Sequence, residues 1–295
     1  MADVHAGYRG LVDIAAIGQV RFADASITAR QTVEIPDLIM GDVDHDAYVY
    51  GKIEVGGSIS GPVTETFISG TGGSGIWDWG AKRYGDCFTM EENDVDIYYY
   101  CGGDNNRHRQ FTGMYVNTLG FSCAAGDIAQ FNMDLMGKSA GDWDQNDLDP
   151  FTNAEKLITW DKVTLSIEVG DESFTVPDNI QYSNFDFTIS NNLQPVYTLG
   201  QNDTVGLFPF EIVPGLRTVT GSISVYNTPQ ADGVKKWDDY EAADFGKITF
   251  NIATLTISMN ARFHRVEPAS SVGPIVSTIG FTSVGALTGS EWRGD

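Results

Sequence analysis

In three segments of the chain, apolar and polar side chains alternate with a period of two. The segments are residues 48–60, 128–136 and 255–264. Their apolar faces consist of Val49, Ile53, Val55 and Ile59; Ala129, Phe131, Met133 and Leu135; and Leu255, Ile257, Met259, Ala261 and Phe263. Such alternation is typical of a strand with one buried face. Because Gly-rich and Asp/Asn-rich turns punctuate the chain, we expect an all-β, antiparallel protein.

Helical periodicity is confined to two short segments. In residues 234–244, Trp237, Tyr240 and Ala243 recur at helical spacing, and Gly246 follows as a stop signal. Residues 76–84 form a weaker candidate that is bracketed by glycines. We expect the aromatic side chains of 76–84 to dock that helix on a sheet.

The two halves of the chain carry similar segments in the same order, which predicts an internal duplication. The matched segments are 20–30 with 180–191, 39–41 with 198–200, and 52–61 with 217–226, the last pair sharing Gly-Ser-Ile-Ser. A helix candidate and a late strand follow in each half, and long amphipathic strands are expected in both halves, at 48–60 with 128–136 and at 216–226 with 255–264. The segment 137–149 lacks apolar periodicity and indicates a connection. We therefore divide the chain into a first module (1–145), a linker (146–158) and a second module (159–295).

Composition supports a folded, β-rich protein. The chain has 295 residues, of which 42% are hydrophobic and 20% charged, and this is a globular composition. The length suits one large domain or two of medium size. The 33 glycines exceed the usual share and favour strands joined by tight turns.

The charge is strongly negative, and this excludes a broad nucleic-acid-binding surface. Lys and Arg number 18 against 40 Asp and Glu, so the formal net charge is −22. Binding to phosphates needs clustered cations. A surface that handles DNA by repelling it remains compatible with this charge, as does ordinary solubility.

The start of the chain predicts neither a secretory signal nor a membrane anchor. Residues 1–20 lack a basic segment, and Asp13 interrupts their apolar stretch. No window approaches the ~20 apolar residues of a membrane span. We expect the protein to fold in a cytoplasm, without a membrane partner.

Motifs for catalysis, cofactors or metals are not recognisable in the sequence. It contains no nucleophile elbow, P-loop or zinc-protease motif. The acidic runs at 42–46 and 142–146 mimic calcium loops but lack the required Gly and Glu, so we interpret them as turns. Cys87, Cys101 and Cys123 fit no zinc spacing; we expect reduced thiols, with an inter-chain disulfide as the alternative. The prediction is therefore a protein without enzymatic activity, cofactor or metal.

A small basic cluster is formed by Arg107, His108 and Arg109. In so acidic a chain, this cluster is a candidate for contact with an acidic patch on a neighbouring subunit. The alternative is a solvated loop tip.

Several motifs together resemble the bacteriophage tail tube (major tail) protein family. In the second half these are Asn191-Asn192-Leu193, Leu199-Gly200, and the run from Pro214-Gly215 through Arg217 to Gly221-Ser222-Ile223. In the first half, residues 111–119 are similar to a family strand with the pattern Phe-x-Gly-x-x-Val-Asn-Ser-Leu. Residues 128–137 are similar to the strand that follows it in the family and ends in Gly-Lys. The resemblance covers about residues 15–140 and 160–290, although the first half lacks the Pro-Gly-x-Arg element.

This resemblance implies tandem β-sandwich or partly open barrel modules, each with one flanking helix. In the family, six modules per ring close a shared inner β-barrel, and the rings stack into a hollow tube. The implied function is a structural subunit of the virion tail, assembled in the host cytoplasm, through which the genome passes. The implied partners are further copies of the chain and, at the tube ends, tape measure, baseplate or tip, and head-proximal terminator proteins.

Side chains that point away from each module's core are candidates for the channel surface. They are Glu54, Ser58, Asn132, Asp134, Thr218, Thr220 and Ser222. Because DNA must slide, we expect an acidic lumen with few phosphate contacts.

Two modules per chain predict a ring of three chains, with a hexamer as the competing arrangement. An inner barrel of roughly 24 strands would exceed the size at which barrels enclose an aqueous channel. A functional alternative of another class is a carbohydrate-binding or adhesive β-sandwich. Its support is the aromatic content of 12% and the expected exposure of Trp77, Trp79 and Trp143.

Overall fold

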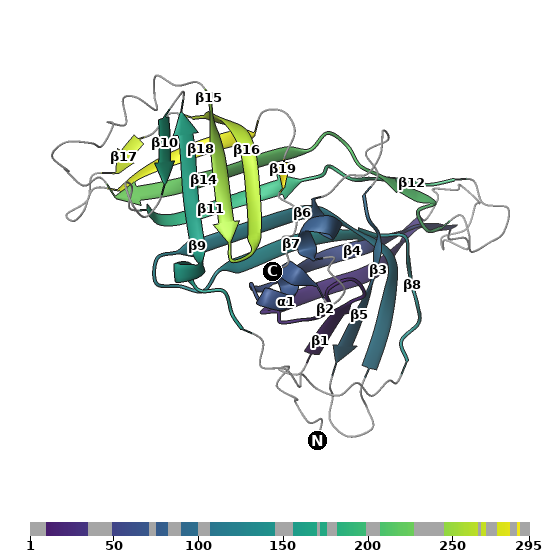
Figure 1. Ribbon diagram of the computed structural model, residues 1–295. Coiled ribbons are helices and arrows are strands. Elements are labelled where there is room, and N and C mark those ends of the chain that lie inside the picture. The colour runs from purple at the N-terminus through teal and green to yellow at the C-terminus, as the bar shows by residue number, and fades with distance from the viewer. Residues whose placement is uncertain are drawn as a thin grey trace.

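The computed structural model describes most of the chain in two halves. The described ranges are 10–34, 49–70, 75–81, 90–99, 107–144, 156–169, 172–175, 182–198, 207–226, 245–264, 267–269, 276–283 and 288–289. Figure 1 shows the first half in purple to blue and the second in teal to yellow, with the two lying side by side. The described residues are mostly β, which confirms the expected fold class.

Short helices accompany the strands of the first half. Its strands are β1 (Gly10–Ile14), β2 (Gly18–Val20), β3 (Asp24–Glu34), β4 (Val49–Pro62), β5 (Asn93–Tyr99), β6 (Arg107–Ala124), β7 (Gln130–Gly137) and β8 (Ser139–Ala140). The helices α1 (Glu65–Ser69) and α2 (Ile76–Gly80) follow β4. The side chain of Thr64 caps α1 by accepting the N–H of Phe67 at 3.1 Å.

The second half is built from shorter strands. They are β9 (Val163–Val169), β10 (Glu172–Thr175), β11 (Tyr182–Ser190), β12 (Gln194–Val196), β13 (Glu211–Val213), β14 (Thr218–Tyr226), β15 (Phe245–Ile252), β16 (Leu255–Phe263), β17 (Glu267–Ala269), β18 (Val276–Ser283) and β19 (Thr288–Gly289). A 3-10 turn, η2 (Trp160–Lys162), precedes β9.

In the first half, β6 belongs to two sheets. Its start pairs with β5, which continues through β1 to β2; we call these strands the first cover sheet. From Tyr115 onward, β6 pairs with β7, which continues through β4 to β3. The change of direction follows Gly113, whose φ of 61° suits glycine. One 18-residue strand therefore joins both layers.

The second half repeats this order of pairing. β10, β9, β15 and β16 form the second cover sheet, while β11, β14 and β18 are consecutive in the other layer. The end of β16 and then β17 pair with β18. The strand beside β14 is thus β18. β16 corresponds to β6, and β18 to β7.

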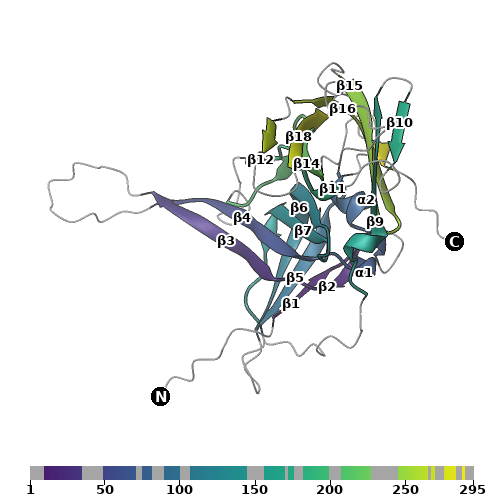
Figure 2. The same ribbon diagram turned by 90° about the vertical axis from the view of Figure 1, so that its left-hand side faces the viewer.

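A direct ladder between β6 and β11 joins the two halves. Its seven residue pairs run from Asn184–Ala124 to Ser190–Thr118. The resulting polar sheet has the order β3, β4, β7, β6, β11, β14, β18, and ends in the last three residues of β16 followed by β17. This sheet runs across both halves in Figure 1, and Figure 2 shows β3 and β4 projecting away from the body.

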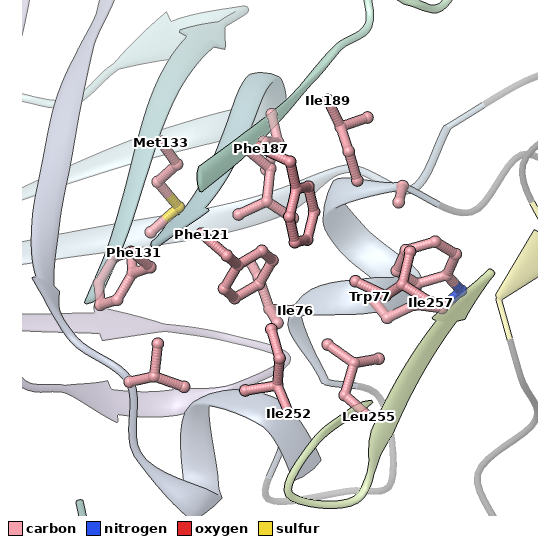
Figure 3. Packing of buried hydrophobic residues seen from close by; sticks show 14 of the residues in the cluster. Ile76, Trp77, Phe121, Phe131, Met133, Phe187, Ile189, Ile252, Leu255 and Ile257 are labelled. Atoms are coloured by element: carbon pink, nitrogen blue, oxygen red, sulfur yellow. The ribbon is translucent and has the colours of Figure 1, made fainter. Parts of the chain in front are cut away.

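One hydrophobic core lies between the polar sheet and the cover sheets. Phe121 of β6, Phe187 of β11 and Phe250 of β15 pack in sequence, with ring centroids 5.6 and 4.6 Å apart. Figure 3 shows Phe121 and Phe187 close to Ile76 and Trp77 of α2. The core therefore crosses the boundary between the halves.

The helix expectations are met in part. Of the segment 76–84, residues 76–80 are helical, and residues 82–84 lie outside the described residues. The side chains of Trp77 and Trp79 dock in the core, as expected of this helix. The candidate at 234–244 lies outside the described residues. Among the residues that the structure describes, no helix is long and apolar enough to cross a membrane.

Candidate functional site

The polar sheet has one apolar face in the core and one face that carries mostly small polar and acidic side chains, with Tyr115 and Met136 in a small apolar cluster at one end of it. Register connects these polar residues across the strands, because directly opposed residues share a face. One row runs through Ser58, Asp134, Thr118, Ser190 and Thr218, each opposite the next. We call this surface the polar face.

All seven residues expected to line a channel lie on the polar face. Glu54 and Ser58 come from β4, Asn132 and Asp134 from β7, and Thr218, Thr220 and Ser222 from β14. Each is exposed or half-buried. Strict alternation in their strands explains why sequence reasoning could group them. Alternation could not predict the ladder between β6 and β11, which joins β14 of the second half to the sheet of the first half.

Hydroxyl groups bind the carboxylates of the polar face. Thr118 Oγ1 donates to Asp134 Oδ2 at 2.8 Å, and Ser222 Oγ donates to Asp186 Oδ1 at 2.5 Å. Both bonds run between neighbouring strands. They hold the acidic groups along the sheet.

Positive charge is restricted to the margins of the polar face. The strands β7, β11, β14 and β18, and β6 from Tyr115 onward, contain no Lys or Arg. On the described face, Arg30, Lys52 and Arg262 lie on β3, β4 and β16. Lys52 Nζ lies 2.5 Å from Glu54 Oε1. The centre of the face thus offers a phosphate group no cationic partner.

The polar face contains open hollows. One of about 560 Å³ is lined by residues that include Ser122, Gln130 and Asp186. Another of about 390 Å³ is lined by residues that include Asn132 and Thr188. Both lie over the β7–β6–β11 region, where the two halves meet.

The Arg107–Arg109 cluster lies in β6 and not at a solvated loop tip. His108 sits between two carboxylates, with Nε2 2.8 Å from Asp96 Oδ1 and Nδ1 2.7 Å from Asp144 Oδ1. Its ring also stacks on Tyr98 at 4.5 Å. Burial opposes a charge on His108, but the hydrogen bonds to both carboxylates outweigh it and raise the pKa.

The remaining members of this cluster differ in their surroundings. Arg109 Nε donates to the carbonyl of Gly141 at 2.9 Å, and the guanidinium lies 5.5 Å from the Trp143 ring centroid. Arg107 is exposed. The cluster therefore holds residues 141–144 against β6 and leaves Arg107 at the surface.

Two of the three tryptophans expected at the surface are buried. Trp77 is 8% exposed and Trp79 is 0% exposed, because α2 packs its aromatic side chains between the sheets. The indole N–H of Trp79 donates to the Met114 carbonyl at 3.0 Å. Only Trp143 of the three is exposed. Trp77 and Trp79 therefore do not support the carbohydrate-binding alternative.

Clusters suited to a metal ion do not occur among the described residues. Asp144, from the acidic run at 142–146, is engaged by His108. The run at 42–46 lies outside the described residues, as do Cys87 and Cys101. Cys123 is a buried free thiol.

Comparison with known families decides what this acidic β protein is. Residues 16–283 match the family model described as phage tail tube protein. The chain belongs to the phage tail tube protein family. Its function is that of a structural subunit of the tail tube, and its place is the virion.

Solved tail structures also match this tail tube protein. The tail of an empty gene transfer agent particle, from helical refinement in C6 symmetry, matches at 12% identity and a TM-score of 0.36, over 45% of this chain and 98% of that chain. The virion of a native gene transfer agent particle matches at 15% identity and a TM-score of 0.32, over 43% of this chain and 95% of that chain. No curated protein sequence matches the chain.

Proposed function

We propose that three copies of this tail tube protein form each ring, with two modules per chain alternating around a central channel. The modules are residues 1–145 and 159–295, joined by the linker 146–158. The repeated order of strand pairing in the two halves supports this division. Stacked rings would then make the tube through which the genome passes.

The ladder between β6 and β11 carries the proposal. It joins the halves edge to edge, so one chain presents eight consecutive strands in its polar sheet. Three chains would supply about 24 strands, and barrels of 16–18 strands already enclose an aqueous channel. Closure into a ring would also remove the exposed sheet edges.

The polar face is our assignment for the channel wall. Glu54, Ser58, Asn132, Asp134, Thr218, Thr220 and Ser222 would face the lumen. Hydroxyl, amide and carboxylate groups would let DNA slide, because few cations are available to hold its phosphates. DNA would therefore pass without a specific binding site.

Other surfaces would make the remaining contacts of the tube. Arg107 is exposed and stays a candidate for contact with an acidic patch on a neighbouring subunit, while His108 and Arg109 would support it from within the chain. Tape measure, baseplate or tip, and head-proximal terminator proteins are the proposed partners at the tube ends.

The competing arrangement is a ring of six full chains in which only one half builds the barrel. It would require that only one half carry the barrel strands. The presence of four polar-sheet strands in each half supports the trimer instead.

Mass per axial repeat of purified tubes, or a helical reconstruction, tests the stoichiometry. We expect three chains and six similar modules per ring. Six full chains per ring would refute the trimer, and discrete monomers that bind glycans would favour the carbohydrate-binding alternative.

A further inference from the structure

The polar sheet ends in two strands that have one open side each among the described residues. At one end, β3 pairs with β4 alone. At the other, β17 pairs with β18 alone. Backbone N–H and C=O groups along such edges need partners, and in a ring assembly the partner available to each edge is the next copy.

The internal duplication indicates what should cover β3. The pair Ser26–Ser58 of β3 and β4 corresponds to Asp186–Ser222 of β11 and β14, because the shared Gly-Ser-Ile-Ser aligns Ser58 with Ser222. β3 is therefore the counterpart of β11. Since β6 covers the outer side of β11, the counterpart of β6 should cover β3.

The counterpart of β6 is formed by β16 and β17 together. Val116 lies opposite Leu135, and a one-residue bulge follows before Gly120 lies opposite Asn132. In the second half, Phe263 lies opposite Phe281, and the register has shifted by one residue where Glu267 lies opposite Thr278. A register shift of one residue therefore falls in the corresponding interval of both halves.

Counting along this shared register aligns three residues of each strand. Gly120, Phe121 and Ser122 of β6 correspond to Glu267, Pro268 and Ala269 of β17. Within the chain, the partners of the β6 residues are Thr188, Phe187 and Asp186 of β11. Their counterparts on β3 are Thr28, Ile27 and Ser26.

We propose that β3 of one copy pairs with β17 of the next copy in the register of the β6–β11 ladder. Ser26 then lies opposite Ala269, Ile27 opposite Pro268, and Thr28 opposite Glu267. This seam rests on the proposed ring assembly and defines which edges close it. Each ring then contains two kinds of equivalent strand seam. One kind joins the two halves of one chain, and the other joins neighbouring chains.

Hydrogen-bond direction explains the proline in this seam. The bonds from Asn191 N to Asn117 O and from Ala125 N to Ser183 O bracket the β6–β11 ladder. In an antiparallel ladder, hydrogen-bonded and non-hydrogen-bonded residue pairs alternate, and counting inward from these two bonds makes Phe121–Phe187 a hydrogen-bonded pair. The backbone N–H of Phe121 therefore points toward β11. Pro268, its counterpart, therefore lacks an N–H on the open side, and the β17–β18 pairing tolerates it.

Pro268 makes the seam between chains weaker than the seam within a chain. The Pro268 carbonyl still accepts from Ile27 N–H, but the reciprocal bond is absent. Ile27 keeps its buried orientation through the β3–β4 ladder, so a register shifted by one residue would set residues that face opposite sides of the sheet against each other, and slippage is opposed.

Disulfide trapping tests the register directly. Ser26 and Ala269 form a non-hydrogen-bonded pair in the proposed seam, where Cα atoms are about 4.5 Å apart, within the range of a disulfide. In assembled tubes of the variant Ser26→Cys with Ala269→Cys, we expect a reducible species of three chains on denaturing gels. A six-chain species would support the seam and refute the trimer.

Matched variants make the trapping experiment specific. Thr28→Cys with Ala269→Cys displaces one thiol along the same face, and we expect a large loss of cross-linking. Equal cross-linking of both pairs would overturn the register. Ser122→Cys with Asp186→Cys, the equivalent pair within one chain, should form a disulfide without an increase in size.

A proline substitution separates assembly from folding. In Ala29→Pro, the lost N–H is one that β3 directs toward its open side, so the β3–β4 ladder is retained. We expect folded chains by circular dichroism that no longer form rings by electron microscopy. Normal tubes from this variant would overturn the seam. Tubes that assemble normally from the Ser26→Cys/Ala269→Cys variant but contain no cross-link would also overturn it. A wild-type chain that forms no rings would instead refute the proposed function.

Discussion

Gly57 of β4 and Gly221 of β14 occupy equivalent places in the two halves. A methyl group on Gly57 would overlap the backbone of Ser26 and Ile27, and one on Gly221 would overlap Asp186 and Phe187. The overlapped residues are themselves counterparts on β3 and β11. The two halves therefore share both an order of pairing and the close approach of a particular pair of strands.

Gly57→Ala and Gly221→Ala should each destabilise the chain by about 1–3 kcal/mol, because the obstructing atoms include backbone that cannot rotate away. Urea unfolding of the purified variants measures the change. Gly141→Ala is the matched control, since the nearest atom to its added methyl group would be the Gln110 carbonyl oxygen at 3.6 Å. A loss for Gly141→Ala as large as for the other two would contradict this explanation.

Local sequence pattern predicted the parts of the fold that depend on a period of two. The alternation in β7 placed Asn132 and Asp134 on the face opposite Phe131, as the structure confirms. The choice of β18 as partner of β14 could not be predicted, because 255–264 has the cleaner alternation. Strand pairing across distant segments depends on tertiary packing, which periodicity does not encode.

The shared face of the expected channel residues was predictable for a similar reason. Alternation alone placed residues such as Ser58 and Thr220 away from the core, and their position in a channel stays a prediction. The partners of His108 lie 12 and 36 residues away along the chain, so their convergence needed the fold. The burial of Trp79 also needed the fold, because an aromatic side chain in a short helix can face either core or solvent.

Reversing charge on the polar face should convert a repelling surface into a binding one. In tubes of Asp134→Lys with Asp186→Lys, we expect retention of short duplex DNA that weakens as salt rises, with a logarithmic slope of about 0.9 per phosphate contact. Retention is measured with fluorescent DNA in pelleted tubes. Glu65→Lys with Asp161→Lys makes the same charge change away from the face. Equal retention by both variants would argue against a channel at the polar face.

His108 should contribute more stability in acid than in base. Because its folded pKa is raised above the ordinary value of 6.5, its contribution is full below that value and is lost as pH rises through the folded pKa. Relative to His108→Gln, we expect an advantage of about 1.5–3 kcal/mol in unfolding free energy at acidic pH that shrinks toward pH 8.

Other ionisable side chains lie near His108, and the comparison of wild type with His108→Gln cancels their contributions. Asp96, Asp144, Tyr98 and Arg109 are present in both proteins. Burial, followed by the charge of Asp96, raises the pKa of Asp13, so its effect has the same sign in wild type and variant. An advantage that is constant from acidic to basic pH would contradict the assigned ion pairs.

Asn191 should be among the most sensitive polar residues of the chain. It is fully buried, and its Nδ2 donates to the carbonyls of Gly80 and Val116 at 2.9 Å each. Asn191→Ala would leave two carbonyls unsatisfied, at a cost of about 1–3 kcal/mol for each. Asn132→Ala, an exposed amide on the polar face, should change stability by less than about 0.5 kcal/mol. Thermal and urea unfolding of both variants makes the comparison.

Cys123 should be inert in the native chain. Burial, followed by the nearby charge of Asp127, raises the pKa of its thiol from 9.0 to about 11, which reduces the thiolate by about 100-fold at mildly basic pH. In a Cys87→Ser/Cys101→Ser variant, we expect slow reaction with a thiol reagent that becomes fast in urea. Rapid native labelling, or a disulfide to another chain on non-reducing gels, would contradict this prediction.

The passage of β6 from the first cover sheet into the polar sheet has a mechanical consequence. Residues 107–114 pair with the first cover sheet, and residues 115–124 pair with strands of the polar sheet. A force that stretches the polar sheet along this strand is therefore transmitted through covalent backbone to the cover sheet. To separate the two sheets, such a force must break the ladder of β6 with the cover sheet or its ladder with the polar sheet. Both ladders bear the force until one of them breaks.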